Sequence, residues 1–230
     1  MINIPIKLAS IYNRIDLALK GTDRSRKDVI LIAASKGQSS SAIRIAYDCG
    51  QRHFGENYLQ EALRKQEELS DLSDICWHFI GPMQSNKTGK ISNNFDWVHT
   101  IDRAKIAERL NISREDDKPP LNVCIQVNIS EETTKSGVSV YECTEIANIV
   151  STFPSLCLRG LMTMPKNNTT KEEYKEMCQT MSTILLKTKS EVSQLTTLDT
   201  LSMGMSSDFE LAIKNGATMV RIGSAIFGPR

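Results

Sequence analysis

Short apolar runs recur along the chain and predict buried strands. Eight such runs are found: Val29–Ala34, Arg52–Phe54, Cys76–Ile80, Trp97–Thr100, Val123–Asn128, Leu158–Met162, Thr200–Met203 and Met219–Ile222. The longer runs are apolar along most of their length, which is typical of strands that are covered on both faces. Arg52–Phe54 is the shortest of them and carries the weakest signal.

Between these runs, apolar residues recur every three or four positions, as they do on the buried face of a helix. A stripe of this kind precedes the first strand and consists of Ile4, Leu8, Ile11, Ile15 and Leu19. Two further stripes cover Cys143–Val150 and Tyr174–Leu185, and shorter helices are expected over Ser41–Cys49, Glu56–Leu69, Ala104–Leu110 and Asp208–Asn215. The pattern therefore alternates strand and helix after a first, additional helix.

Alternation of strands and helices predicts an α/β fold with a parallel sheet. Eight strands in 230 residues match a single-domain (β/α)8 barrel of the TIM type that spans residues 1–230, near the lower end of the size range of that fold. The alternative is an open, doubly wound sheet. Such sheets usually carry a glycine-rich turn after the first strand. The corresponding segment, Ser35-Lys36-Gly37-Gln38, does not fit that pattern.

The composition narrows the class of protein. Hydrophobic residues make up 40% of the chain and charged residues 24%, which excludes a disordered or collagen-like chain. The net charge of +1 gives no basic field for nucleic acid and no polybasic face for a membrane surface. The longest apolar run, Val29–Ala34, is far shorter than the roughly 20 residues that span a bilayer. The charged, amphipathic N-terminus is not a secretory signal, so a cytoplasmic protein is expected.

Cysteine and histidine spacing predicts neither disulfides nor a metal site. Six cysteines are dispersed along the chain without a CxxC pair, and we expect free thiols. His53, His78 and His99 each lie in or beside a predicted strand, but no HExxH motif or clustered His/Cys spacing appears. The Walker spacing of a P-loop and the GxSxG elbow of a hydrolase are also missing.

Lys36 is the most unusual residue at a predicted strand end. It follows Ile30, Ile32 and Ala34 at the strand period, so its side chain is expected on their face. A lysine at the end of an apolar strand loses hydration, which favours the neutral and nucleophilic amine. Such an amine attacks an aldehyde to form a Schiff base. The alternative is a lysine that extends its ammonium group past the strand end into water.

Small residues and hydroxyl groups gather after the last two strands, in Ser202–Ser206 and Gly223–Ala225. Loops at this place, together with a helix N-terminus, often bind phosphate in eight-stranded barrels. Because strand eight of a closed barrel lies beside strand one, a phosphate here and an aldehyde at Lys36 would be neighbours. Pyridoxal 5′-phosphate (PLP) carries both groups on one small ring. The alternative is that these glycines only permit tight turns.

Arg221 stands inside the last predicted strand, between apolar residues. A charge in this position is costly unless it is paired. It is expected to meet a carboxylate, such as Glu56 or Asp208, or to face a ligand. As a donor to a pyridine nitrogen, it would keep that nitrogen unprotonated and so discourage carbanion chemistry.

Longer motifs extend these observations over essentially the whole chain: Ala34–Lys36, Phe54–Tyr58, Trp77–Gly81, Gln84–Lys87, Arg159–Met164, Ser202–Ser206 and Val220–Gly228. Together they resemble the pyridoxal phosphate homeostasis protein family, relatives of the N-terminal barrel domain of alanine racemase. The resemblance implies that Lys36 holds PLP as a Schiff base. It also implies that Gly223 and Ser224 hold the phosphate, together with the loop that contains Ser202, Met203 and Ser206.

The same resemblance implies further roles. Arg221 matches the arginine that faces the pyridine nitrogen, and Asn57 falls in the pocket-lining motif. Two positions depart from the family pattern. Gly37 replaces the usual threonine after the lysine and is expected to loosen that loop, whereas Ser224 replaces a threonine and keeps its hydroxyl group.

Two classes of function compete. One is a PLP carrier for intracellular PLP homeostasis and delivery to apoenzymes, without turnover of its own. The other is a small amino-acid racemase, which needs a second acid/base such as Tyr58 or His78. In the related racemases a C-terminal β-domain contributes to the site across a dimer. This chain stops at Arg230, just beyond strand eight, so the carrier is expected.

Further expectations concern partners. Lys135, in the loop after strand five, is expected to be a solvated side chain, and the alternative is a secondary contact for phosphate or for a recipient protein. No surplus apolar stripe demands a dimer, so a monomer is expected. Apoenzymes are expected as transient partners, and neither nucleic acid nor membrane is expected.

Overall fold

The computed structural model describes residues 3–130, 132, 135–166, 168–192 and 197–228. Eight parallel strands form a closed barrel in sequence order. They are β1 (Ile30–Ala34), β2 (His53–Glu56), β3 (Cys76–Phe79), β4 (Trp97–Ile101), β5 (Leu121–Gln126), β6 (Leu156–Met162), β7 (Thr200–Ser202) and β8 (Met219–Ile222). This confirms the predicted (β/α)8 barrel and rules out the open sheet, because β1 pairs with β8.

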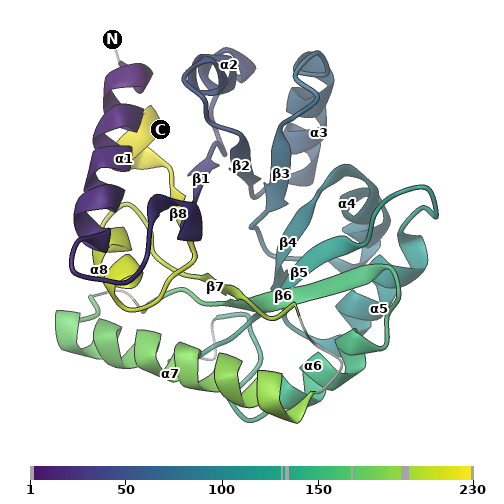
Figure 1. Cartoon of the computed structure of the whole chain (residues 1–230). Helices are drawn as coiled ribbons and strands as arrows, with labels where there is room; N and C mark the ends of the chain where they lie inside the picture. The colour runs from purple at the N-terminus through teal and green to yellow at the C-terminus, as the bar shows by residue number, and fades with distance from the viewer. Residues whose placement is uncertain (1–2, 131, 133–134, 167, 193–196, 229–230) are drawn as a thin grey trace.

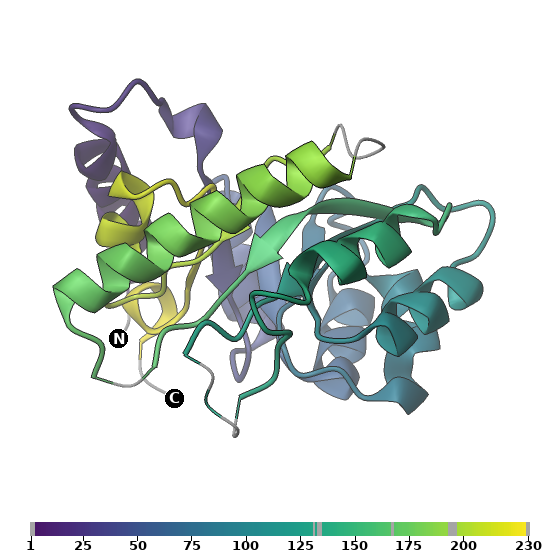
Figure 2. The same ribbon diagram turned by 90° about the horizontal axis from the view of Figure 1, so that it is seen from below.

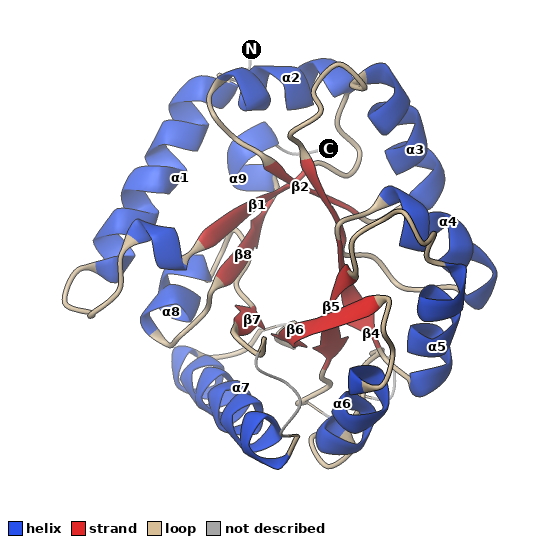
Figure 3. Ribbon diagram, turned by 45° about the vertical axis from the view of Figure 1, so that its right-hand side comes forward, coloured by secondary structure: helices blue, strands red, loops and turns tan. Residues whose placement is uncertain are grey.

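Helices surround the barrel in a ring, as Figure 3 shows. They are α1 (Ile4–Leu19), α2 (Ser40–Asp48), α3 (Leu59–Glu68), α4 (Thr88–Asn94), α5 (Ala104–Ser113), α6 (Cys143–Ser151), α7 (Lys171–Glu191), α8 (Phe209–Lys214) and α9 (Ser224–Phe227). Two 3-10 turns, Arg26–Asp28 and Ser85–Lys87, complete the described elements.

The additional helix α1 lies beside α8 and α9, so the first and last elements of the chain are neighbours (Figure 1). Asn3 accepts a hydrogen bond from the Ile6 amide and caps this helix. The long helix α7 runs across the strands β6 and β7 (Figure 2). Its N-terminus is closed by a capping box between Thr170 and Glu173.

The core has two parts, one on each face of the sheet. The larger part lies between the strands and the helices, and it contains alternate strand residues such as Leu31, Ala33 and Phe54. The smaller part lies inside the barrel and consists of Ile32, Trp97, Cys124, Met162 and Met219. Because successive strand residues point to opposite faces, the interior also receives His78, His99, Ser202 and Arg221, and all four are buried.

All eight strands were predicted, with ends that differ by up to two residues. The predicted Val123–Asn128 begins two residues earlier, at Leu121, and the predicted Arg52–Phe54 extends to Glu56. Helices α4 and α9 were not predicted. Helix α4 has the sequence TGKISNN, in which Ile91 is the only large apolar residue, so no periodic stripe marks it.

The six cysteines are free thiols, as expected. In the part of the chain that the structure describes, no helix has the length and apolar character needed to cross a bilayer.

Candidate functional site

A cavity of about 420 Å³ opens at the carboxyl ends of the strands, where β1 and β8 meet. This volume is within the range of small-molecule sites. The residues that line it come from the ends of six strands and the loops that follow them: Ala34, Lys36, Gln38, Asn57, Ile80, Met164, Met205, Ser206, Ser207, Arg221, Gly223, Ser224 and Gly228. Six of the eight predicted site residues are among them, namely Lys36, Asn57, Ser206, Arg221, Gly223 and Ser224.

Lys36 enters the cavity from the turn that follows β1. Gly37 closes this turn at a φ of 74°, in the left-handed region that favours glycine. The Gly37 amide donates to Glu61 Oε1 at 2.6 Å. The turn beside Lys36, which Gly37 was expected to loosen, is therefore held by a charged acceptor.

A buried charge cluster lies directly beneath this turn. Lys65 Nζ is within 2.7 Å of Glu56 Oε1 and of the Ser35 carbonyl oxygen, and within 2.6 Å of Glu61 Oε1. The Ser35 hydroxyl donates to Glu56 Oε1 at 2.6 Å. Burial raises the pKa of the Glu56 carboxyl, and the hydrogen bonds from Lys65 and Ser35 oppose that effect. The cluster thus fixes the backbone on both sides of Lys36, since Lys65 binds the Ser35 carbonyl oxygen and Glu61 binds the Gly37 amide.

Arg221 reaches the cavity floor from the interior face of β8. Its guanidinium donates to the carbonyl oxygen of Ser202 at 2.7 Å, to Ser202 Oγ at 2.7 Å and to the carbonyl oxygen of Thr163 at 2.9 Å. Among the described residues no carboxylate forms an ion pair with it, so of the two alternatives expected for Arg221 the carboxylate partner, Glu56 or Asp208, is wrong. The other alternative, a place facing a ligand, fits its position at the cavity. Glu56 binds Lys65 instead. Burial lowers the pKa of Arg221, which nevertheless stays protonated at any physiological pH.

Small hydroxyl residues form the side of the cavity next to Arg221. Ser224 begins α9, and its hydroxyl lies 3.3 Å from that of Ser206, in the loop after β7. The first amides of a helix have no partners within the helix, so they point toward whatever lies at its start. This wall therefore presents donors suited to an anion.

Asn57, which follows β2, contributes an acceptor. Its side chain lines the cavity, and its Oδ1 atom is buried without a hydrogen-bond partner in the described part of the structure. Buried acceptors of this kind are rare in native proteins, and a ligand is one common explanation. The cavity thus combines one amine, one guanidinium, two or more hydroxyls and an orphaned amide oxygen.

Ser202 and Met203 lie outside the set that lines the cavity. Ser202 is buried directly below Arg221 and accepts its hydrogen bonds. Met203 is fully buried in the outer part of the core, and its amide donates to the Met219 carbonyl oxygen. The predicted contact of these two residues with a ligand stays a prediction, and Ser202 is joined to the cavity through its hydrogen bonds with Arg221.

Lys135 was the other lysine expected at this end of the barrel. It forms an ion pair with Glu132 at 3.0 Å and donates to the Pro165 carbonyl oxygen at 3.0 Å. The preceding residues 133 and 134 lie outside the described residues. Lys135 therefore joins the loops after β5 and β6, and its predicted solvated state is only partial.

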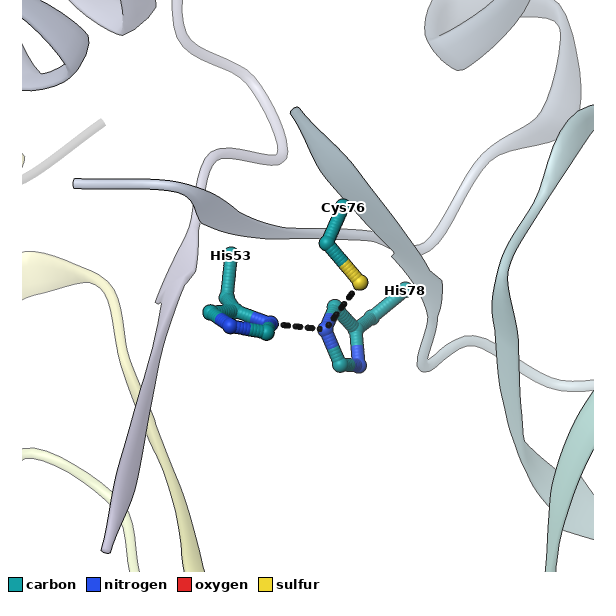
Figure 4. Close-up of side chains that lie close together, drawn as sticks. All are labelled: His53, Cys76 and His78. Carbon is teal, nitrogen blue, oxygen red and sulfur yellow. Dashed lines mark hydrogen bonds between the residues drawn. The ribbon is translucent and has the colours of Figure 1, made fainter. Parts of the chain in front are cut away.

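A chain of hydrogen-bonded histidines that no sequence motif indicated crosses the barrel interior. His53 Nδ1 lies 2.9 Å from His78 Nε2, and His78 Nδ1 lies 2.9 Å from His99 Nε2. His99 Nδ1 then lies 2.9 Å from Ser202 Oγ, the acceptor of Arg221. Cys76 Sγ joins this chain at His78 Nε2, as Figure 4 shows. The sequence contains one signal for this chain of contacts. Cys76 and His78 are two residues apart on β3 and therefore share a face, and His53 and His99 lie on the neighbouring strands β2 and β4.

Three comparisons with known proteins show which family this chain is similar to. The profile of the family described as alanine racemase, N-terminal domain, matches residues 6–230. The pyridoxal phosphate homeostasis protein of Escherichia coli strain K12 is 45% identical over 232 residues, which cover 100% of this chain and 98% of the relative. A protein of the same name from Haemophilus influenzae is 46% identical over 229 residues, covering 99% and 96% of the two chains. A solved structure of PipY from Synechococcus elongatus with PLP bound has a TM-score of 0.87 and 36% identity, and it covers 98% of this chain and 100% of PipY.

Proposed function

This chain belongs to the family of pyridoxal phosphate homeostasis proteins, and from that premise we propose that it binds PLP through Lys36 and acts in PLP homeostasis inside the cell. The observation that carries the proposal is the meeting of Lys36, Arg221 and Ser224 around one cavity of about 420 Å³. These three side chains come from the two strands that close the barrel, so the closure itself brings them together.

The residues of the cavity fit the chemical groups of PLP. The primary amine of Lys36 suits the aldehyde, and the hydroxyls of Ser206 and Ser224 suit the phosphate, together with the first amides of α9. The orphaned Asn57 Oδ1 suits a donor on the ligand, such as the phenolic hydroxyl. Arg221, a permanent donor, suits the unprotonated ring nitrogen.

Bound PLP supplies an aldehyde that forms a Schiff base with an amine, with loss of one water molecule, and a ring that withdraws electrons when its nitrogen is protonated. Lys36 supplies that amine. Arg221 donates hydrogen bonds and cannot give up its proton, so a ring nitrogen facing it stays unprotonated. This pairing favours storage of the cofactor over carbanion chemistry.

We further propose that the protein has no turnover of its own. Among the described residues that line the cavity, Lys36 and Arg221 are the only ones with ionisable side chains, and Arg221 does not give up its proton. Tyr58 is 57% exposed and does not line the cavity, and His78 is buried below Arg221 in the barrel interior. The two candidates for the second base of a racemase are therefore both outside the cavity.

The test begins with the visible absorption of the purified protein after addition of PLP. We expect a Schiff-base band that disappears in Lys36→Ala, and borohydride should fix the cofactor to the peptide that contains Lys36. Lys90→Ala is the matched control, because Lys90 is exposed on the outer helix α4. An unchanged band in Lys36→Ala, or reduction at another lysine, would contradict the assignment.

Delivery and turnover need separate assays. A PLP-dependent apoenzyme should regain activity faster from the loaded protein than from an equal concentration of free PLP, because an imine exchanges with amines and with water. Incubation of the loaded protein with L-alanine or L-serine should leave the enantiomer unchanged. Rapid conversion to the D form would favour the racemase instead.

A further inference from the structure

A second group of reactive side chains lies at the opposite end of the barrel from Lys36. His53 is the first residue of β2 and Cys76 the first residue of β3, and the two are direct neighbours in the strand register. His78 follows two residues after Cys76 and so shares its interior face. The three side chains point toward one another, as Figure 4 shows.

The donor atoms of this group are close enough to share one ion. The ring nitrogens of His53 and His78 and the sulfur of Cys76 all lie within 4.8 Å of one another. His78 Nε2 is 2.9 Å from His53 Nδ1 and 3.4 Å from Cys76 Sγ. In a tetrahedral zinc site, bond lengths of about 2.0 Å to nitrogen and about 2.3 Å to sulfur separate the ligand atoms by about 3.3–3.6 Å. The two distances that meet at His78 Nε2 differ from these separations by no more than a few tenths of an ångström.

We propose that His53, Cys76 and His78 bind one divalent cation of borderline softness, of the Zn²⁺ class, at the amino-terminal end of the barrel. Two imidazoles and one thiolate are the ligand set that such cations prefer over Mg²⁺ or Ca²⁺. His53 and Cys76 are half-buried, so the cation can enter from this end and keep water as a fourth ligand.

The surroundings are suited to this charge. Burial lowers the pKa of His53 and His78, so both rings are neutral at pH 7 and have a lone pair for a metal. Burial also raises the pKa of the Cys76 thiol to about 12, so a cation that binds this sulfur has to displace the thiol proton, which passes to solvent at the half-buried end of the barrel. The carboxylate of Asp96 influences both His53 and Cys76 and adds negative charge beside them.

Binding has a consequence inside the barrel. Without a cation, Ser202 accepts from Arg221 and can donate to His99 Nδ1, so that His99 Nε2 donates to His78 Nδ1 and His78 Nε2 donates to His53. A cation on His78 Nε2 forces the His78 proton onto Nδ1, where it donates to His99. The His99 proton then moves to Nδ1 and donates to Ser202. Cation binding therefore reverses the direction of every bond between His78 and Ser202.

The proposal is tested by titrating the metal-free full chain with Zn²⁺ in competition with a chromophoric chelator. We expect one Zn²⁺ per chain in the wild type and an affinity at least about tenfold lower in Cys76→Ser. Cys49→Ser is the matched control, because Cys49 is exposed at the end of α2, and it should bind as the wild type does. Wild-type binding no tighter than that of Cys76→Ser, or an equal loss in Cys49→Ser, would overturn the site.

Two spectroscopic measurements separate this site from adventitious binding. Co²⁺ should give a thiolate charge-transfer band in the wild type and in Cys49→Ser, and no such band in Cys76→Ser or His53→Gln. Ring ¹⁵N shifts should report a change of tautomer at His78 and His99 when Zn²⁺ is added. Unchanged ring shifts would show that Zn²⁺ binds elsewhere. None of these measurements uses PLP, so a failure of the proposed cation site can be distinguished from a failure of the proposed function.

Discussion

Lys65 Nζ lies 2.7 Å from Glu56 Oε1, and both side chains are almost completely shielded from solvent, at 1% and 0% exposure. The same ammonium group binds the Ser35 carbonyl oxygen, one residue before Lys36. A buried ion pair of this kind is a weak source of net stability, because desolvation offsets much of the attraction. Its position indicates a different contribution, which is to fix the turn that presents Lys36.

Lys65→Met should lower the free energy of unfolding by about 3–5 kcal/mol, because it leaves the Glu56 carboxylate buried without its partner. PLP affinity should fall as well, since the Ser35 carbonyl loses its anchor. Urea unfolding and a PLP titration measure the two effects. Arg44→Ala, which breaks an exposed ion pair with Asp71, should change stability by less than about 1 kcal/mol. A Lys65→Met variant as stable as the wild type would contradict the importance of the pair.

Arg221→Lys should weaken PLP binding by at least about tenfold, because one ammonium group cannot reproduce the planar fork that binds Ser202 and Thr163 together. Stability should fall by about 1–3 kcal/mol as buried carbonyl oxygens lose their donors. Arg159→Lys is the control, since Arg159 pairs with Asp199 outside the cavity. Equal PLP affinities of Arg221→Lys and the wild type would argue against a direct contact between Arg221 and the ligand.

Gly223→Ala should reduce PLP affinity while the protein stays folded. A Cβ atom at this position would lie 3.0 Å from the Ala34 carbonyl oxygen, at the junction of β8 and β1 that the cavity occupies. The backbone at Gly223 has a negative φ of −116°, so the expected cost of the alanine comes from the close contact with Ala34 and not from a left-handed backbone. Gly89→Ala in α4 serves as the control, because its Cβ would meet nothing closer than 3.5 Å. That variant should gain about 0.5–1 kcal/mol of stability and bind PLP as the wild type does.

Glu173 should titrate far below its usual range. The hydrogen bond from Lys166, followed by those from the amide and hydroxyl of Thr170, lowers the pKa of this carboxyl to about 2. A lowered pKa means that the carboxylate stabilises the folded state above pH 4.5 and that this contribution disappears as the pH falls toward 2. An NMR titration of the side chain measures the midpoint directly. Lys166→Ala should raise the midpoint, whereas an unshifted midpoint in the wild type would contradict the capping box at the start of α7.

The sequence predicted the architecture well because the barrel is built from local patterns. Strands such as Ile30–Ala34 are continuously apolar, which is typical of strands that are buried on both faces. Such a run can be recognised in the sequence without knowledge of the strands that it pairs with. Helix α4 was missed because it lacks a local apolar pattern of this kind. Only Ile91 and two small polar residues of it are buried, so its position depends on packing against α5 and not on a stripe of its own.

The residues of the candidate site could be predicted where the side chain and its place at a strand end indicate a chemical role. Lys36, Asn57, Ser206, Arg221, Gly223 and Ser224 were proposed from strand ends, small-residue loops and a family resemblance, and the structure places all six around one cavity. Ser202 and Met203 belong to the same motif, yet the alternation of a strand turns one below Arg221 and the other into the outer core. A motif alone does not distinguish these two orientations.

What the sequence by itself determined was the repeating alternation of strand and helix and the identity of the few polar residues at strand ends, since both are properties of short segments. Only the tertiary structure decided which distant residues meet. Lys65 reaches Glu56 and the turn beside Lys36, and His53, Cys76 and His78 converge on one point, because barrel closure and strand register fix which interior side chains face each other. Those contacts join residues on different strands and helices, and no local pattern along the chain records them.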